Sequence, residues 1–488
     1  GLTPTFGSPP YHATQWTLSA FAQDDWRKSR ALVINIGVRY DYFTHMVVKP
    51  TTPADAALYN LDGLLDRNFN FGPYRDPNNP YKSDGGVNLQ PRFGFSYNPG
   101  GQGKTAIRGG FGVMFSPQLL GSTYVNVGSK LVPSRVTFTR QEIINNGIRW
   151  PMFAEDLSKI VEQNAKTSGK INIRSVYDPN LQNPYSMNWS LGIQRTLGAN
   201  LMLETAFVGN RGVKFLLHRW FNLPDRLTGI RPNPNLGSGY YIDSGQNTVY
   251  NSWQTSLRKR FSRNFSGSAH FTWGKALSTG GGGDIGSYYQ GDNAIRVQDF
   301  WNPKADRGPA AGDITHYFSG EWLYELPQLS GRHALLHRGL GGWQVSGVFL
   351  AQSGDAMNAS QSSALEGSRG DYVGGAIYRE DYTATLRYLN AAAFARVPIG
   401  SASGVPVRPG NAGVGIVRGP GMWNMDLGIS KEFPIVERVR LHLRADMFNS
   451  LNHTNLSGLV TEVTNSNFGM LRSTRGARVI QLNARLKW

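Results

Sequence analysis

The chain has 488 residues, no cysteine and a formal charge of +17, from 50 Lys and Arg against 33 Asp and Glu. Only 17% of the residues are charged and 58 are Gly, whereas average soluble domains have about 25% charged residues and about 7% Gly. A hydrophobic content of 40% excludes a disordered polycation. The lack of cysteine excludes thiolate chemistry, and no stretch approaches the roughly 18 to 20 apolar residues of a membrane-spanning helix.

Hydrophobic residues alternate with period two in thirteen segments, which predicts β-strands whose two faces differ in polarity. Most of these segments have about ten residues, the length that crosses a bilayer at a tilt. In chain order the expected strands are 16–25, 32–42, 89–97, 107–115, 185–193, 201–207, 253–261, 265–273, 313–326, 342–354, 423–430, 438–447 and 476–488.

Short turns and long polar segments alternate between these strands. The long segments are 46–87, 117–182, 212–247, 279–312, 356–420 and 451–474, and a short helix is expected near 153–164. Soluble sandwiches and propellers also use period-two strands. Strand length, aromatic residues at strand ends and the loop asymmetry favour an antiparallel transmembrane β-barrel, with turns in the periplasm and loops outside the cell.

Motifs in the predicted hairpins resemble the C-terminal barrel of TonB-dependent outer-membrane receptors, in particular the Oar-like group of acidobacteria. The matching stretches are Phe21-Ala-Gln-Asp-Asp-Trp26, Asn35-Ile-Gly-Val-Arg-Tyr-Asp-Tyr-Phe43, Gln90-Pro-Arg-Phe-Gly-Phe95, Ile107-Arg-Gly-Gly-Phe-Gly112, Trp189-Ser-Leu-Gly-Ile-Gln-Arg195, Ser256-Leu-Arg-Lys-Arg-Phe261, Gly342-Trp-Gln-Val-Ser-Gly347, Arg418-Gly-Pro-Gly421 and Ala445-Asp-Met-Phe-Asn-Ser-Leu-Asn-His453. The resemblance implies that residues 1–488 are the C-terminal part of a barrel of about 22 strands. A signal peptide, a regulatory-like domain and a plug are then expected outside this chain, which would close only with a partner fragment.

The resemblance also implies a function and a set of partners. The function is that of a receptor that binds a solute at its extracellular loops and imports it with energy passed by TonB to the plug. The implied partners are outer-membrane lipid and lipopolysaccharide, the N-terminal plug and barrel remainder, TonB, an unknown solute and the barrel-assembly machinery. That machinery would recognise a C-terminal signal formed by Ile480, Leu482, Leu486 and Trp488.

If the apolar strand faces meet lipid, the alternate residues line the lumen, and many of these are basic. The candidate lumen-facing cations are Arg39, Arg92, Arg108, Arg258, Arg260, Arg438, Arg440, Arg444 and Arg485, and the main acids are Asp41, Glu321, Asp426 and Asp446. One interpretation is a basic lumen that pairs with plug carboxylates and favours anionic solutes. The other is a wall of structural cross-strand pairs.

Paired aromatic residues in the predicted outer loops are candidates for ligand binding, because flat rings stack on sugars or peptides. The candidates are Trp220, Tyr240, Tyr241, Tyr288, Tyr289 and Trp301. The simpler interpretation is that such rings pack the loops together or mark the membrane interface.

Catalytic and metal-binding patterns are missing from the sequence. The nine histidines form no His-Glu-x-x-His pattern, no Gly-x-Ser-x-Gly elbow occurs, and the acids fit no calcium loop. The basic residues are dispersed, without the compact run of a nucleic-acid reader. We therefore expect no enzyme, cofactor, metal or nucleic-acid partner. The alternative function is a structural or adhesive surface barrel that binds proteins or matrix.

Overall fold

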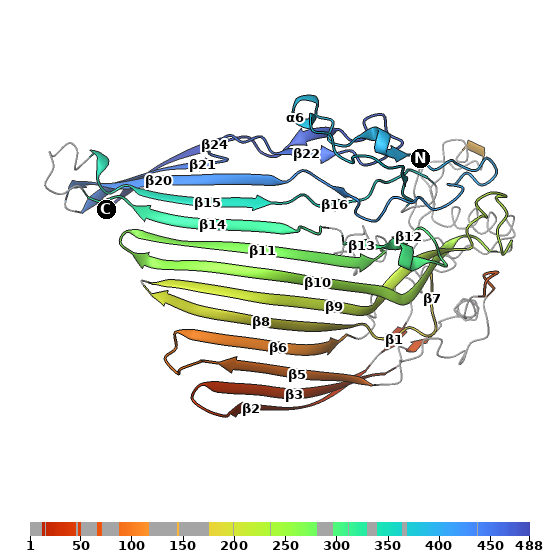
Figure 1. Ribbon diagram of the computed structural model, residues 1–488, viewed down its shortest axis with the longest axis horizontal. Helices are drawn as coiled ribbons and strands as arrows, with labels where there is room; N and C mark the ends of the chain where they lie inside the picture. Colours follow the sequence, from red (N-terminus) through yellow and green to blue (C-terminus); the bar gives the residue numbers. More distant parts are fainter. Residues whose placement is uncertain are drawn as a thin grey trace.

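The computed structural model describes residues 12–14, 16–44, 47–49, 66–70, 87–116, 144–145, 175–198, 200–234, 236–280, 296–310, 312–328, 339–363, 368–436 and 438–488. Thirteen strands pair in chain order, each antiparallel to the next (Figure 1). They are β2 (Thr17–Arg27), β3 (Leu32–Phe43), β5 (Asn88–Tyr97), β6 (Thr105–Phe115), β8 (Tyr185–Gly198), β9 (Leu201–Phe221), β10 (Gly239–Ser262), β11 (Phe265–Thr279), β14 (His316–Glu325), β15 (Gln344–Gln352), β20 (Met422–Val436), β21 (Val439–Phe448) and β24 (Val479–Lys487). The prediction of an all-β antiparallel sheet is confirmed.

The two ends of the sheet differ, as the sequence predicts. Short hairpin turns join the strands at the left of Figure 1, whereas the long connections and the smaller elements gather at the right. Among the described residues, no helix combines the length and hydrophobicity that a membrane span requires.

The register separates an apolar face from a polar face across the whole sheet. Phe93 on β5 lies opposite Phe111 on β6, which lies opposite Trp189 on β8. The neighbouring row on the other face is Arg92, Gly112 and Asn188. Large apolar side chains at mid-strand are open to the surroundings, with Trp253 47% and Trp273 59% exposed. The core of a soluble sandwich would bury these rings, whereas a lipid-facing surface leaves them open.

Strands β9 and β10 are longer than predicted, and the expected loop 212–247 is wrong over much of its length. β9 continues to Phe221 and β10 begins at Gly239, so the connection shrinks to residues 222–238. In this extension Leu216, Leu217 and Ile242 are buried. The short strands β7 (Ser175–Tyr177) and β12 (Arg296–Val297) pair with β10 and β9 there. Apolar residues in consecutive positions hide the period-two signal.

The long connections and the segment before β2 contain short elements that the sequence does not predict, and several of them build an assembly at the loop end. A small apolar core joins the β15–β20 connection to the β21–β24 connection, and Phe394 packs edge-on against Phe468 at 5.3 Å between ring centroids. The elements are β1 (His12–Thr14), β4 (Val47–Lys49), η2 (Pro303–Asp306), β13 (Arg307–Pro309), β16 (Ala356–Met357), β17 (Asp371–Tyr372), α6 (Tyr382–Thr385), η3 (Ala391–Ala393), β18 (Phe394–Ala395), β19 (Val417–Arg418), β22 (Leu456–Leu459) and β23 (Leu471–Thr474). The helix expected near 153–164 lies outside the described residues.

Candidate functional site

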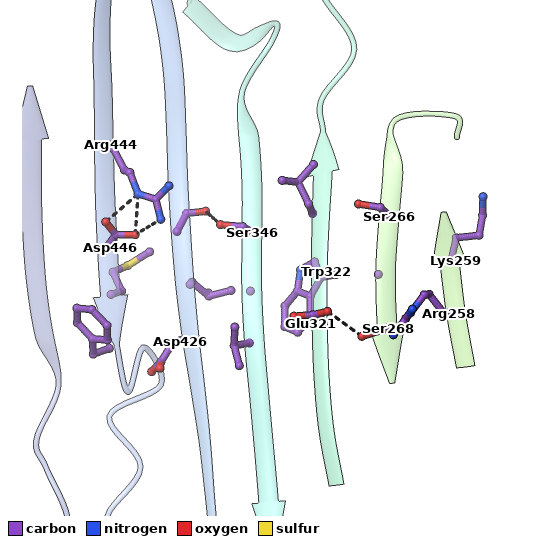
Figure 2. Close-up of a pocket in the computed structure, with 18 of the residues that line it drawn as sticks. Arg258, Lys259, Ser266, Ser268, Glu321, Trp322, Ser346, Asp426, Arg444 and Asp446 are labelled. Carbon is purple, nitrogen blue, oxygen red and sulfur yellow. Dashed lines mark hydrogen bonds and ion pairs between the residues drawn. The ribbon is translucent and has the colours of Figure 1, made fainter. Parts of the chain in front are cut away.

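A hollow of about 670 Å³ lies against the sheet where β10, β11, β14, β15, β20 and β21 run side by side (Figure 2). It is lined by Arg258, Lys259, Arg260, Ser266, Gly267, Ser268, Glu321, Trp322, Leu323, Ser346, Gly347, Val348, Asp426, Leu427, Gly428, Arg444, Asp446, Met447 and Phe448. The register places its charged and hydroxyl groups on the polar face, with the exception of Lys259. On the polar face this part of the wall carries the small residues Ser266, Ser268, Ser346 and Gly428, which leave it hollow.

Some charges in the hollow are paired and others are free. The Arg444 guanidinium donates hydrogen bonds to both carboxylate oxygens of Asp446, at 2.8 and 2.9 Å, and the Ser268 hydroxyl donates to Glu321 at 2.9 Å. Both contacts are visible as dashed lines in Figure 2. Arg258 and Arg260 make no ion pair within the part of the chain that the structure describes. The hollow can therefore attract an anionic group without first breaking a pair.

The nine predicted cations do not form one cluster. Arg258, Arg260 and Arg444 line the hollow, whereas Arg39 and Arg92 line a separate recess of about 230 Å³ formed by β2, β3 and β5. The remaining four lie elsewhere: Arg108 on β6, Arg438 in the turn before β21, Arg440 on β21 and Arg485 on β24. Sequence periodicity assigns a face but not a neighbour, so it could not separate these groups.

Several of these arginines pair with neighbouring side chains. Arg39 bonds Asp41 at 2.9 Å, Arg108 donates to Gln194 at 2.9 Å, and Arg440 lies 3.5 Å from Glu432. The Arg108–Gln194 and Arg440–Glu432 contacts join neighbouring strands, as the structural interpretation expects, whereas Arg39 and Asp41 lie on the same strand. The free Arg258 and Arg260 suit the functional interpretation. The sequence analysis missed Ser266, Ser268 and Ser346, because serine on a polar strand face carries no distinctive signal.

The predicted aromatic residues pack against each other at the loop end. The Trp220 and Tyr240 rings are 4.2 Å apart at their centroids, and Trp301 packs on Phe300 at 4.7 Å. Tyr241 is only 7% exposed and lies in a core with Phe221. Trp301 also packs against Phe69, at 5.6 Å between ring centroids, yet it stays 55% exposed. Tyr288 and Tyr289 lie outside the described residues. Ligand binding by these rings stays a prediction.

Buried polar contacts fasten the loop assembly. Arg369 pairs with Asp306, and both side chains are more than nine-tenths buried. Gln298 joins them, because its backbone N–H donates to Asp306 at 2.8 Å and its side-chain oxygen accepts from the Arg369 backbone N–H at 2.8 Å. Arg226, from the β9–β10 connection, donates to the carbonyls of Gln298 and Pro406. Three connections are thereby linked into one body.

Burial and neighbouring arginines shift the pKa values of carboxyl groups in this assembly. Burial raises the pKa of the Asp243 carboxyl to about 6, although Arg219 beside it favours the charged form. Hydrogen bonds from Arg408 hold the pKa of Asp371 below its usual range. Among the described residues, no group of His, Asp and Glu has the arrangement of a metal site.

The model of the outer membrane beta barrel domain family matches residues 2–481, nearly the whole chain. The chain belongs to this family. An outer membrane beta barrel domain lies in the bacterial outer membrane, so the exposed apolar face of the sheet meets lipid. The predicted localisation is confirmed.

Solved structures with similar chain traces share little sequence with this outer membrane beta barrel domain. The outer membrane transporter YddB from Escherichia coli has 12% identity and a TM-score of 0.49, with 97% of this chain and 45% of that chain covered. The siderophore receptor PirA from Acinetobacter baumannii has 10% identity and a TM-score of 0.44, with 97% and 46% covered. The chain thus spans less than half the length of these proteins. Among curated proteins, none is similar enough to count as a match.

Proposed function

We propose that this chain is the barrel portion of an outer-membrane receptor that binds a solute at its extracellular loops and imports it with TonB-derived energy. The observation that carries the proposal is the loop assembly, in which the buried Arg369–Asp306 pair holds connections from distant strands together. Ordering so many loop residues costs conformational entropy. A pre-formed surface lowers the ordering cost of binding a solute.

The polar face of the sheet supports the proposal that a solute passes through the barrel. The free cations Arg258 and Arg260 line a hollow on the lumen side of the wall, where a plug or a passing anionic solute would meet them. The strand order runs from β2 to β24 without a pairing that joins these two edges in the described residues. We propose that further strands complete the barrel and that a plug fills it, as in Oar-like TonB-dependent receptors.

The test compares solute depletion by living cells. The wild-type host and a strain lacking the gene grow in the same complex medium, and mass spectrometry measures which solutes disappear from it. We expect at least one solute to be depleted only by the wild type, and a protonophore to stop its depletion. The Trp301→Ala variant, which loses the exposed ring, should deplete that solute several-fold more slowly at equal surface abundance.

Two outcomes would contradict the proposal. If both strains deplete the same solutes, the protein transports none of them. If depletion continues in the presence of the protonophore, the solute passes through the barrel without energy input. If the strain lacking the gene instead loses adhesion to proteins or matrix while depletion is unchanged, the structural or adhesive function replaces transport.

A further inference from the structure

A furrow crosses the apolar face of the sheet at β10, β11, β14 and β15, on the turn side of the exposed tryptophans. Its floor consists of the small residues Gly267, Ala269 and Gly320, and its volume is about 550 Å³. The register aligns Leu257, Ala269, Gly320 and Phe349 in one row across the four strands. We call this hollow the apolar furrow.

Large side chains border the apolar furrow on both sides. Phe318 and Phe349 pack together at 5.9 Å between ring centroids, and Leu257 and Phe265 are 39% and 37% exposed. Neighbouring parts of the apolar face fill such gaps with their own rings, since Trp189 covers Gly209 and Phe95 covers Gly109. A Cβ on Gly320 would meet nothing closer than the Phe318 ring at 3.6 Å. The floor of the furrow is therefore open at this glycine.

A lysine stands at the turn-side end of the apolar furrow. Lys259 lies opposite Gly267, which places its stem on the apolar face. Its ammonium donates to the Ser262 hydroxyl and, at 3.4 Å, to the Arg260 carbonyl. Within the described residues it has no carboxylate partner. An ammonium has three N–H donors, so at least one stays available for a further partner.

We propose that the apolar furrow and Lys259 bind one glycerophospholipid of the inner leaflet, with an acyl chain in the furrow and the phosphate at Lys259. The turn end of the barrel faces the periplasm, where the inner leaflet presents phosphate groups. Lysine stems lie along apolar surface and keep their charge at the headgroups. An acyl chain that lies on the small residues between the bordering aromatic side chains gains dispersion contacts that a flat protein surface does not offer.

The test measures lipid retention by the purified full-length protein in mild detergent. Native mass spectrometry follows the titration of the delipidated protein with dioleoyl phosphatidylglycerol. We expect the first lipid molecule to bind at least tenfold more tightly than the lipid molecules that bind after it. Lys259→Gln should weaken this first binding about fivefold or more, and Lys259→Arg should restore most of it. Gly320→Leu should abolish it, because the added side chain occupies the furrow without a clash against backbone.

Matched variants separate the furrow from general effects on the apolar face. Lys275→Gln removes another lysine of this face, at the loop end, and Ala445→Leu enlarges a small residue of this face on β21. Both should bind the first lipid like the wild type, and all variants should show the heat-dependent gel shift of a folded barrel.

Three outcomes would overturn the proposal. The first is that the wild type binds the first lipid molecule and the later ones with equal affinity. The second is unchanged first-lipid binding in both Gly320→Leu and Lys259→Gln. The third is a stable dimer that Gly320→Leu disrupts, since a second copy would then occupy the furrow.

Discussion

Trp189 on β8 and Gly209 on β9 lie directly opposite each other, and the indole ring covers the glycine so closely that a Cβ there would overlap it. Two further cross-strand pairs repeat the arrangement on the same face, Phe95 over Gly109 and Trp322 over Gly347. In each pair the glycine lets a large ring lie flat along the lipid-facing surface.

We expect Gly209→Ala to destabilise the protein by about 1–3 kcal/mol, the usual cost of overpacking a well-packed contact. The added methyl group must displace the Trp189 ring. Urea unfolding of the full chain in phospholipid vesicles, followed by tryptophan fluorescence, measures the change. The control is Gly110→Ala on the polar face, where a Cβ would lie 3.5 Å from the nearest atom, the Phe93 carbonyl oxygen. Equal losses in both variants would contradict the role of the ring.

We expect Arg369→Met to open the loop assembly. The substitution leaves Asp306 charged and buried without its partner, which typically costs about 3–5 kcal/mol. Limited proteolysis of intact cells should cut the surface loops at least tenfold faster than in the wild type. The control is Arg379→Met, which removes an exposed ion pair that solvent screens and that contributes little to stability. Loops that stay resistant in Arg369→Met would show that this pair does not fasten the assembly.

We expect the stability of the loop assembly to fall as the pH rises from 4 to 6. Asp243 lies outside the membrane, among the loops, and burial raises its pKa to about 6 from the ordinary 3.8. In this window the folded carboxyl holds a proton that the unfolded carboxyl has lost, so raising the pH favours unfolding. The slope is at most about 1.4 kcal/mol per pH unit for one group.

Asp243→Asn should remove this dependence, because the amide does not titrate. Proteolysis rates of the loops between pH 4 and pH 7, on wild type and variant, make the comparison. The idea fails if the two proteins show the same pH profile, since another group would then be responsible.

We expect Asn222→Ala to free the β9–β10 connection. Asn222 is fully buried at φ +50, and its amide donates to the carbonyls of Asn233 and Leu236 at 2.9 and 2.8 Å. Alanine loses these bonds and strains the backbone, at a cost of about 3 kcal/mol or more. Asn222→Gly keeps the backbone relaxed and separates the two contributions. Hydrogen exchange of residues 222–238 measures the opening, and unchanged protection in Asn222→Ala would rule out this anchor.

The sequence by itself determined the membrane-spanning sheet. Alternation of apolar and polar residues identifies each strand locally, because a strand between lipid and a polar interior must show period two. The face of Arg444 and the apolar position of Leu427 follow from the same pattern, and the register agrees with both. Even the weakly patterned strands at 313–354 lie where they were expected.

Only the tertiary structure decided the rest. The extensions of β9 and β10, the Arg369–Asp306 pair and the grouping of Arg258 with Arg444 all depend on segments far apart in the chain. Where loops cover both faces of a strand, apolar and polar residues no longer alternate, so the local sequence pattern does not identify the strand there. Contacts between distant loops leave no periodic trace in the sequence, because their geometry exists only after the sheet brings the strand ends together.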